Sequence, residues 1–189
     1  MAKIIGFEKW NSRKLFVLHM ETPLHDVENK LGLKNIPFDE RTCEEKDLDE
    51  VWNSIKDEYC GVIISGSRKW QEELPPVPLN ILSTDKPLLG ICYGNEMLGL
   101  HLGSKIIDCE KPGEHSEVIG KLFPSVLFKG MDLEVDHILT MAHDYMLDSV
   151  PNGCKIIAQT NMTPIAGFEC LSRRKWGIQF HPEKNLQIT

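Results

Sequence analysis

The stretch PLLGICYGNEMLGLHLG, residues 87–103, places a lone cysteine between an apolar run and a helix-like segment. A strand that turns sharply into a helix exposes the residue at its corner, and that residue needs small neighbours because backbone atoms crowd there. Gly90 and Gly94 supply that room on either side of Cys92. The partial positive charge and free N–H groups of a helix N-terminus favour a thiolate and can also hold an oxyanion. The stretch therefore predicts that Cys92 is a nucleophile at the end of a strand.

The segments around this turn alternate between strand and helix patterns in the first half of the chain. We expect strands at 14–20, 61–64 and 105–109, and helices that begin at Pro23, Leu48 and Asn95, the second of them reaching Tyr59. The second half is richer in short β-branched segments, which predicts strands at 117–122, 125–128, 137–141 and 155–160 and a hairpin over 164–183 with its turn at 171–175. The pattern predicts an α/β fold with a central, mostly parallel sheet and added antiparallel strands. With no linker or repeat in 189 residues, we expect a single domain, 1–189.

The composition excludes several classes of protein. The formal net charge is −7 and there is no basic block, which argues against nucleic acid as a partner. The longest apolar runs are far too short to span a bilayer, and the first residues lack the apolar core of a signal peptide, so we expect a cytoplasmic protein with no membrane partner. The six cysteines form no CxxC pair, and no Cys/His spacing is typical of a metal site.

A base for the cysteine is found near the end of the chain, in GIQFHPE, residues 177–183. His181 and Glu183 are two residues apart, and such residues point to the same side of an extended segment. Glu183 could therefore orient one imidazole nitrogen of His181 while the other faces the thiol of Cys92, as in a catalytic triad. The alternative is that His181 ends a strand and Glu183 is solvated.

Together, GICYG and the distant GIQFHPE resemble the class I glutamine amidotransferases, the triad glutaminase family. The resemblance covers most of the chain and implies a three-layer, flavodoxin-like fold with Cys92, His181 and Glu183 as the triad. It also implies an oxyanion hole made by the backbone amides of Ser67 and Tyr93, with Gly66 permitting the turn. The chemistry that it implies, hydrolysis through a Cys thioester, needs no metal or organic cofactor.

Two further segments refine this resemblance. MAHDY, residues 141–145, is similar to the segment whose backbone helps to hold the substrate's α-carboxylate, which implies that Ala142, His143 and Asp144 lie near the substrate. The order of the motifs most resembles the glutaminase part of GMP synthetases. FHPEK is also common in the glutaminase of imidazole glycerol phosphate synthase, and the motifs alone do not separate the two.

The sequence departs from the family at Glu96, where most members carry a glutamine that contacts the side-chain end of the substrate. The related γ-glutamyl hydrolases also carry a glutamate there, so we expect Glu96 to face the substrate and to shift preference toward a substituted γ-glutamyl amide. The alternative is a partly exposed residue of the first helical turn. A second departure, Arg68 in the glycine loop, is expected to be a solvated charge, with binding of a substrate carboxylate as the alternative.

Three functions remain open at this point. The first is a glutaminase that acts on glutamine and passes ammonia to a separate synthetase partner. The second is a stand-alone hydrolase of γ-glutamyl amide conjugates. The third is a catalytically silent regulatory or binding subunit, against which the intact set of Cys92, His181 and Glu183 argues.

Overall fold

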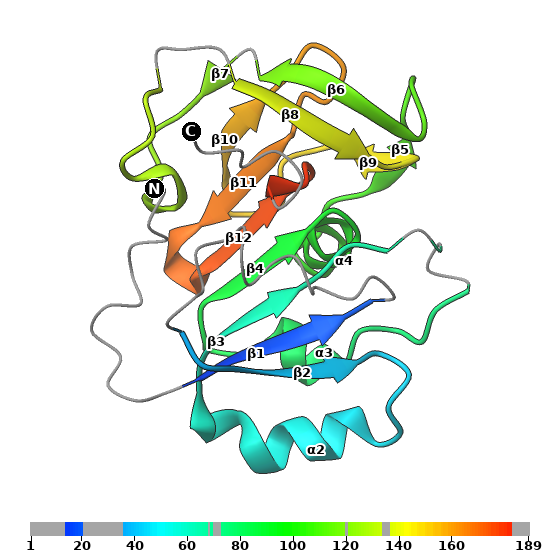
Figure 1. The fold of residues 1–189 in the computed structure, drawn as a ribbon, viewed down its shortest axis with the longest axis vertical. Helices are drawn as coiled ribbons and strands as arrows, with labels where there is room; N and C mark the ends of the chain where they lie inside the picture. The colour runs from blue at the N-terminus through cyan, green and yellow to red at the C-terminus, as the bar shows by residue number, and fades with distance from the viewer. Residues whose placement is uncertain are drawn as a thin grey trace.

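The computed structural model describes residues 14–20, 36–67, 69, 73–119, 121–133 and 137–182. Within them, an eight-stranded sheet has the strand order β2-β1-β3-β4-β12-β11-β10-β7 (Figure 1). The strands are β1 (Lys14–His19), β2 (Phe38–Thr42), β3 (Tyr59–Ile64), β4 (Leu88–Ile91), β7 (Lys121–Leu122), β10 (Lys155–Gln159), β11 (Gly167–Cys170) and β12 (Lys175–Ile178). Pairing is parallel from β2 to β12 and antiparallel from β12 to β7. The predicted α/β fold, with a mostly parallel sheet and added antiparallel strands, is confirmed.

Two antiparallel ribbons form separate two-stranded sheets. β5 (Ile106–Asp108) pairs with β9 (Tyr145–Leu147), and β6 (Glu114–Ile119) pairs with β8 (His137–Ala142). The β6–β8 ribbon lies at the end of the molecule opposite helix α2 (Leu48–Ile55) in Figure 1. The turn between β8 and β9 contains His143 and Asp144, so the ribbons carry the predicted substrate segment.

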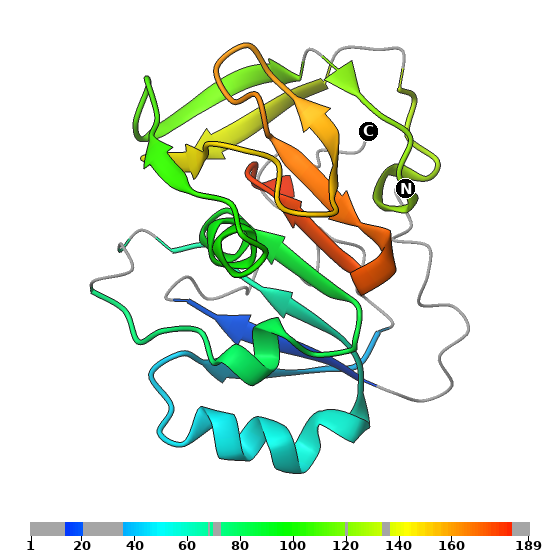
Figure 2. The ribbon, with the colours of Figure 1, turned by 180° about the vertical axis from the view of Figure 1, so that it is seen from behind.

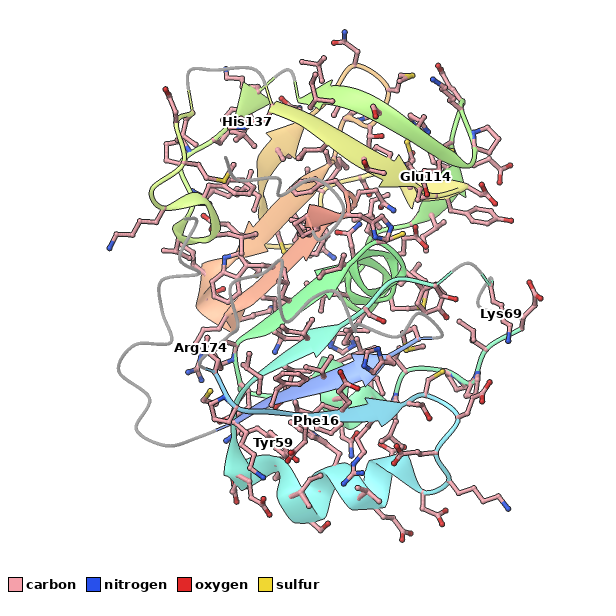
Figure 3. The ribbon with its side chains drawn as sticks, viewed as in Figure 1. Phe16, Tyr59, Lys69, Glu114, His137 and Arg174 are labelled. Atoms are coloured by element: carbon pink, nitrogen blue, oxygen red, sulfur yellow. The ribbon has the colours of Figure 1, made fainter. Side chains whose placement is uncertain are left out.

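The helices differ from the prediction in their ends. α2 ends at Ile55 rather than at Tyr59, and a short 3-10 turn over Lys56–Glu58 separates it from β3. Tyr59 begins β3 instead, because its ring packs against that of Phe16 on β1, with the ring centroids 5.3 Å apart, and its hydroxyl donates to Asp39 (Figure 3). The helix predicted from Pro23 lies outside the described residues.

The remaining helical segments include one further correction. α3 (Leu79–Leu82) and α4 (Tyr93–His101) lie on the near side of the sheet in Figure 2, and α4 begins two residues earlier than predicted. The strand predicted at 125–128 is a 3-10 turn over Val126–Phe128, because the Ser125 hydroxyl accepts a hydrogen bond from the amide of Leu127 and closes the turn. The final hairpin is present, with a 3-10 turn over Leu171–Arg173 and with Lys175 already in β12.

Both faces of the parallel strands β1, β3 and β4 are buried, whereas the edge strand β2 is polar and partly exposed. On β1, Phe16 and Leu18 join the cluster that contains Trp52 of α2, while Leu15 and Val17 join the cluster on the other face, with Phe128. Parallel strands covered on both faces are apolar along their whole length, which is why their sequences read as continuous hydrophobic runs. This packing holds the sheet rigid beneath the turns at its carboxyl edge.

The parallel pairing of β4 with β12 positions the candidate site. In the register, Ile91 lies opposite Ile178, and the amide of Cys92 donates to the carbonyl of Ile178 at 2.8 Å. Parallel strands have their carboxyl ends at the same edge, where ligands bind in open α/β sheets. Residues that follow β3, β4 and β12 therefore meet at one edge of the sheet.

Candidate active site

Cys92 occupies a strained turn between β4 and α4. Its backbone has φ 52° and ψ −109°, a conformation that is costly for a residue with a Cβ. A Cβ added at Gly90 would lie 2.3 Å from the carbonyl oxygen of Gly94, and one at Gly94 would lie 2.3 Å from that of Ile64. Only glycine fits at either position, so the local sequence permits the sharp turn that presents Cys92.

The loop after β3 is fixed against this turn. The amide of Gly94 donates to the Ser65 carbonyl at 3.2 Å, and the Ser65 hydroxyl accepts from the Met20 amide at 3.0 Å. A Cβ added at Gly66 would lie 3.0 Å from Cε1 of His181 and 3.2 Å from Cβ of Cys92. Gly66 therefore lies against both side chains, and the fold brings the predicted nucleophile and the predicted base together.

His181 follows β12 and is also held by the neighbouring ribbon. Its amide donates to the carbonyl of Thr140 on β8 at 2.9 Å. Glu183, the predicted orienting carboxylate, lies outside the described residues, as does Arg68. Ser67 is described at the end of the glycine loop, where its hydroxyl accepts from the amide of Lys69 at 2.9 Å.

The turn between β8 and β9 lies over Cys92. The thiol of Cys92 donates to the carbonyl of Ala142 at 3.4 Å. Asp144 is exposed, and its carboxylate accepts from the amide of Gly113 at 2.8 Å. Of the three residues predicted near the substrate, Ala142 contacts the cysteine directly, and the following residue is buried.

That residue is His143, whose side chain is 6% exposed. Its Nδ1 lies 2.9 Å from the carbonyl oxygen of Tyr145, which can only accept, so Nδ1 carries a proton. Burial lowers the pKa of His143, with the nearby His115 and His181 acting in the same direction, and the ring is neutral. Its Nε2 is then an acceptor, and it has no hydrogen-bond partner among the described residues.

Glu96 is buried rather than partly exposed, with 3% of its surface accessible. Its Oε1 accepts from Nε2 of Gln179 at 2.9 Å, and the same nitrogen lies 3.9 Å from the sulfur of Cys92. Burial raises the pKa of Glu96 to about 8, the Gln179 hydrogen bond opposes this rise, and the charge of Asp144 adds to it. Burial also raises the pKa of Tyr93 to about 12, and the charge of Glu96 contributes.

Gln179 is a site residue that the sequence interpretation missed. It lies two residues before His181, in the bend that follows β12, so its place within the motif GIQFHPE is the signal that could have found it. The sequence analysis also passed over His115, whose Nε2 lies 2.6 Å from Oε1 of Glu117. The same two-residue spacing on a strand would have paired them.

Glu117 anchors a buried polar cluster behind the His143 turn. Its carboxylate accepts hydrogen bonds from the hydroxyls of Thr160 and Thr163, and the rings of His115 and His143 have centroids 6.0 Å apart. Glu117 itself is only 4% exposed. The cluster holds β6 and β8 against the loop after β10. It is a structural support of the wall that carries His143.

The described residues contain no group of His, Cys, Asp and Glu arranged to hold a metal ion. Over the same residues, no helix combines the length and the apolar character needed to cross a membrane.

Comparison with known proteins agrees with the geometry. Residues 27–189 match the family model described as glutamine amidotransferase class-I. Curated relatives include the glutamine-hydrolysing GMP synthases of Clostridium perfringens, 36% identical over 126 residues, and Xylella fastidiosa, 32% identical over 130 residues. Each alignment covers 65% of this chain and 24% of the relative, so the chain spans about a quarter of the length of these proteins.

Solved structures share the fold. A protein of Thermoplasma acidophilum described as a GMP synthase subunit superposes with a TM-score of 0.73 at 19% identity, covering 90% of this chain and 85% of that one. A glutamine amidotransferase from Thermotoga maritima gives 0.69 at 20% identity, covering 91% and 76%. The predicted resemblance to the glutaminase part of GMP synthetases is confirmed, and the chain belongs to the glutamine amidotransferase class-I family.

Proposed function

We propose that this chain, as a single domain over 1–189, hydrolyses the side-chain amide of glutamine through a thioester on Cys92. The observation that carries the proposal is the position of Gly66 at the end of three adjacent strands. Its missing Cβ leaves room for the side chains of His181 and Cys92, which both lie against it. A histidine beside a cysteine on a strained turn is the arrangement that activates a thiol.

In the proposed reaction, His181 removes the thiol proton of Cys92, and Glu183 orients the imidazole. The sulfur attacks the γ-carbonyl carbon and forms a C–S bond. The C–N bond then breaks, and ammonia leaves with the proton that His181 donates. Water, deprotonated by His181, attacks the thioester, breaks the C–S bond and releases glutamate and the thiol.

Backbone and side-chain groups around Cys92 suit the other parts of the substrate. The amides of Ser67 and Tyr93 would hold the oxyanion, and Gly66 permits the loop to approach Cys92. The unpartnered acceptor Nε2 of His143 would accept an N–H of the substrate, such as its α-ammonium group. Ala142 and Asp144 would complete this wall, and Glu96 would contact the side-chain end of the substrate.

The ammonia would pass to a synthetase partner in the cytoplasm. This part of the proposal is supported by the relatives, which are named glutamine-hydrolysing GMP synthases and are about four times as long as the matched segment.

A second candidate is a stand-alone hydrolase of substituted γ-glutamyl amides. The buried carboxyl of Glu96 favours it, because a glutamate rather than a glutamine would meet the side-chain end of the substrate. The two candidates share the Cys92 chemistry and differ in the leaving amine.

The test is glutamate release from glutamine and from an N-substituted γ-glutamyl amide, with and without the synthetase part of a GMP synthase. We expect Cys92→Ser to abolish turnover of either substrate. Cys154→Ser, at the opposite edge of the sheet, is the matched control and should turn over normally. Activity on glutamine that rises with the synthetase supports the first candidate, and full activity on the substituted amide alone supports the second. Turnover that survives Cys92→Ser would refute both.

A further inference from the structure

Three buried polar side chains form a chain of hydrogen bonds beside Cys92. Nδ2 of Asn95 donates to Oε1 of Gln179 at 2.8 Å, and Nε2 of Gln179 donates to Oε1 of Glu96 at 2.9 Å. Because Asn95 holds the Gln179 oxygen as an acceptor, the Gln179 nitrogen must face Glu96. The same nitrogen lies 3.9 Å from the sulfur of Cys92. One side-chain amide therefore contacts both the candidate nucleophile and the carboxyl group.

Glu96 lacks a cationic partner among the described residues. The titratable side chains that face it are Tyr93 on its own helix, Asp144 from the β8–β9 turn and Cys92 on the far side of Gln179, and none of them is a cation. A buried carboxylate without a cation is strongly disfavoured, so the group protonates instead. Burial raises the pKa of Glu96 to about 8, which agrees with a neutral carboxyl at neutral pH.

The hydrogen bond from Gln179 also bears on which oxygen of Glu96 carries the proton. Oε1 accepts from Gln179, so the proton resides on Oε2. A protonated carboxyl donates one hydrogen bond, whereas a carboxylate can only accept. A neutral Glu96 thus offers a carbonyl oxygen and one donor, as a glutamine side chain at the same place would do.

Building on the proposed function, we propose that Glu96 is a specificity-determining residue that donates a hydrogen bond from its protonated carboxyl to the side-chain end of the substrate. Gln179, anchored by Asn95, is the positioning residue that directs this donor beside Cys92. A neutral Glu96 accepts an uncharged carboxamide. Its ionised form would lose the donor and place a second negative charge near the reacting thiolate.

The first test compares the pH dependence of KM for glutamine in the wild-type chain and in Glu96→Gln, from about pH 6 to about pH 9.5. Groups shared by the two proteins cancel in the ratio of their KM values. We expect the ratio of the wild-type KM to the KM of Glu96→Gln to be level below pH 8 and to rise about tenfold for each pH unit above it. Parallel profiles in the two proteins would overturn the proposal.

Gln179→Leu tests the positioning role. The hydrogen bond from Gln179 lowers the pKa of Glu96, so its removal should move the inflection of the KM profile to higher pH and raise KM throughout. A purely structural role for Gln179 would change turnover and leave the inflection where it was, and that result would contradict the assignment.

A direct titration keeps this proposal separate from the proposed function. In Cys92→Ser labelled with ¹³C at the glutamate carboxyls, the resonance that disappears in the additional Glu96→Gln variant belongs to Glu96. We expect its midpoint near pH 8, and a midpoint at or below the ordinary 4.5 would overturn the inference. If no variant turns over glutamine, the proposed function fails, and this titration still decides the state of Glu96.

Discussion

The burial of Glu96 makes the stability of the fold depend on pH in a predictable direction. Its folded pKa of about 8 lies above the ordinary value of 4.5, so the folded chain binds this proton more tightly than the unfolded chain does. The resulting stabilisation is complete below pH 4.5 and is lost as the pH rises through about 8. At about 1.4 kcal/mol per pKa unit, the loss from this one group amounts to about 4 kcal/mol between pH 5 and pH 9.

The assay is urea unfolding of the wild type and Glu96→Gln at five pH values in that range, followed by tryptophan fluorescence. All other titrating groups are common to both proteins, so the difference between their free energies of unfolding isolates Glu96. We expect Glu96→Gln to gain about 4 kcal/mol relative to the wild type from pH 5 to pH 9. A difference that stays constant with pH would refute the reasoning, because it would mean that the carboxyl is solvated or paired with a cation.

Glu169 provides a matched control for this experiment. It is equally buried at 2% exposure, but its carboxylate lies 2.8 Å from Nζ of Lys155 and accepts a hydrogen bond from the indole of Trp176. Glu169→Gln removes an ion pair, so we expect it to destabilise the chain at every pH in the series. A rise in stability with pH for both variants would point to a general effect of glutamate replacement rather than to the environment of Glu96.

Three further substitutions probe the site and its supports. Gly66→Ala places a Cβ 3.0 Å from Cε1 of His181, so the imidazole must shift by a few tenths of an ångström. We expect turnover of glutamine to fall about 100-fold with little change in melting temperature. Normal turnover by the folded variant would contradict the contact. Gly94→Ala forces a Cβ to within 2.3 Å of a backbone oxygen of β3, and we expect a low soluble yield, whereas wild-type stability would show that the turn can relax. Glu117→Ala breaks the buried polar cluster and should cost about 3 kcal/mol in urea unfolding. The exposed Glu114→Ala on the same strand should cost less than about 0.5 kcal/mol, and equal costs would contradict the role of the cluster.

Much of the fold could be predicted because its signals are local. Strands such as β3 and β4 are buried on both faces, and their apolar runs are visible without any knowledge of their neighbours. One error occurred where contacts between distant segments decided the outcome. Tyr59 continues the apolar face of α2 in the sequence, yet it begins a strand because Phe16 and Asp39 receive its ring and hydroxyl.

The same division applies to the candidate site. The sequence alone predicted the sharp turn at Cys92, because the glycines that permit it are close by in the chain and their effect is a matter of local backbone sterics. Only the tertiary structure placed His181 and Gly66 against the cysteine, since this contact requires the parallel pairing of β4 with β12 and with β3. It also buried the carboxyl of Glu96, and this burial raises the pKa of that group to about 8. A pKa depends on burial and on the charges that surround a group, and around Glu96 these come from segments more than 40 residues away along the chain.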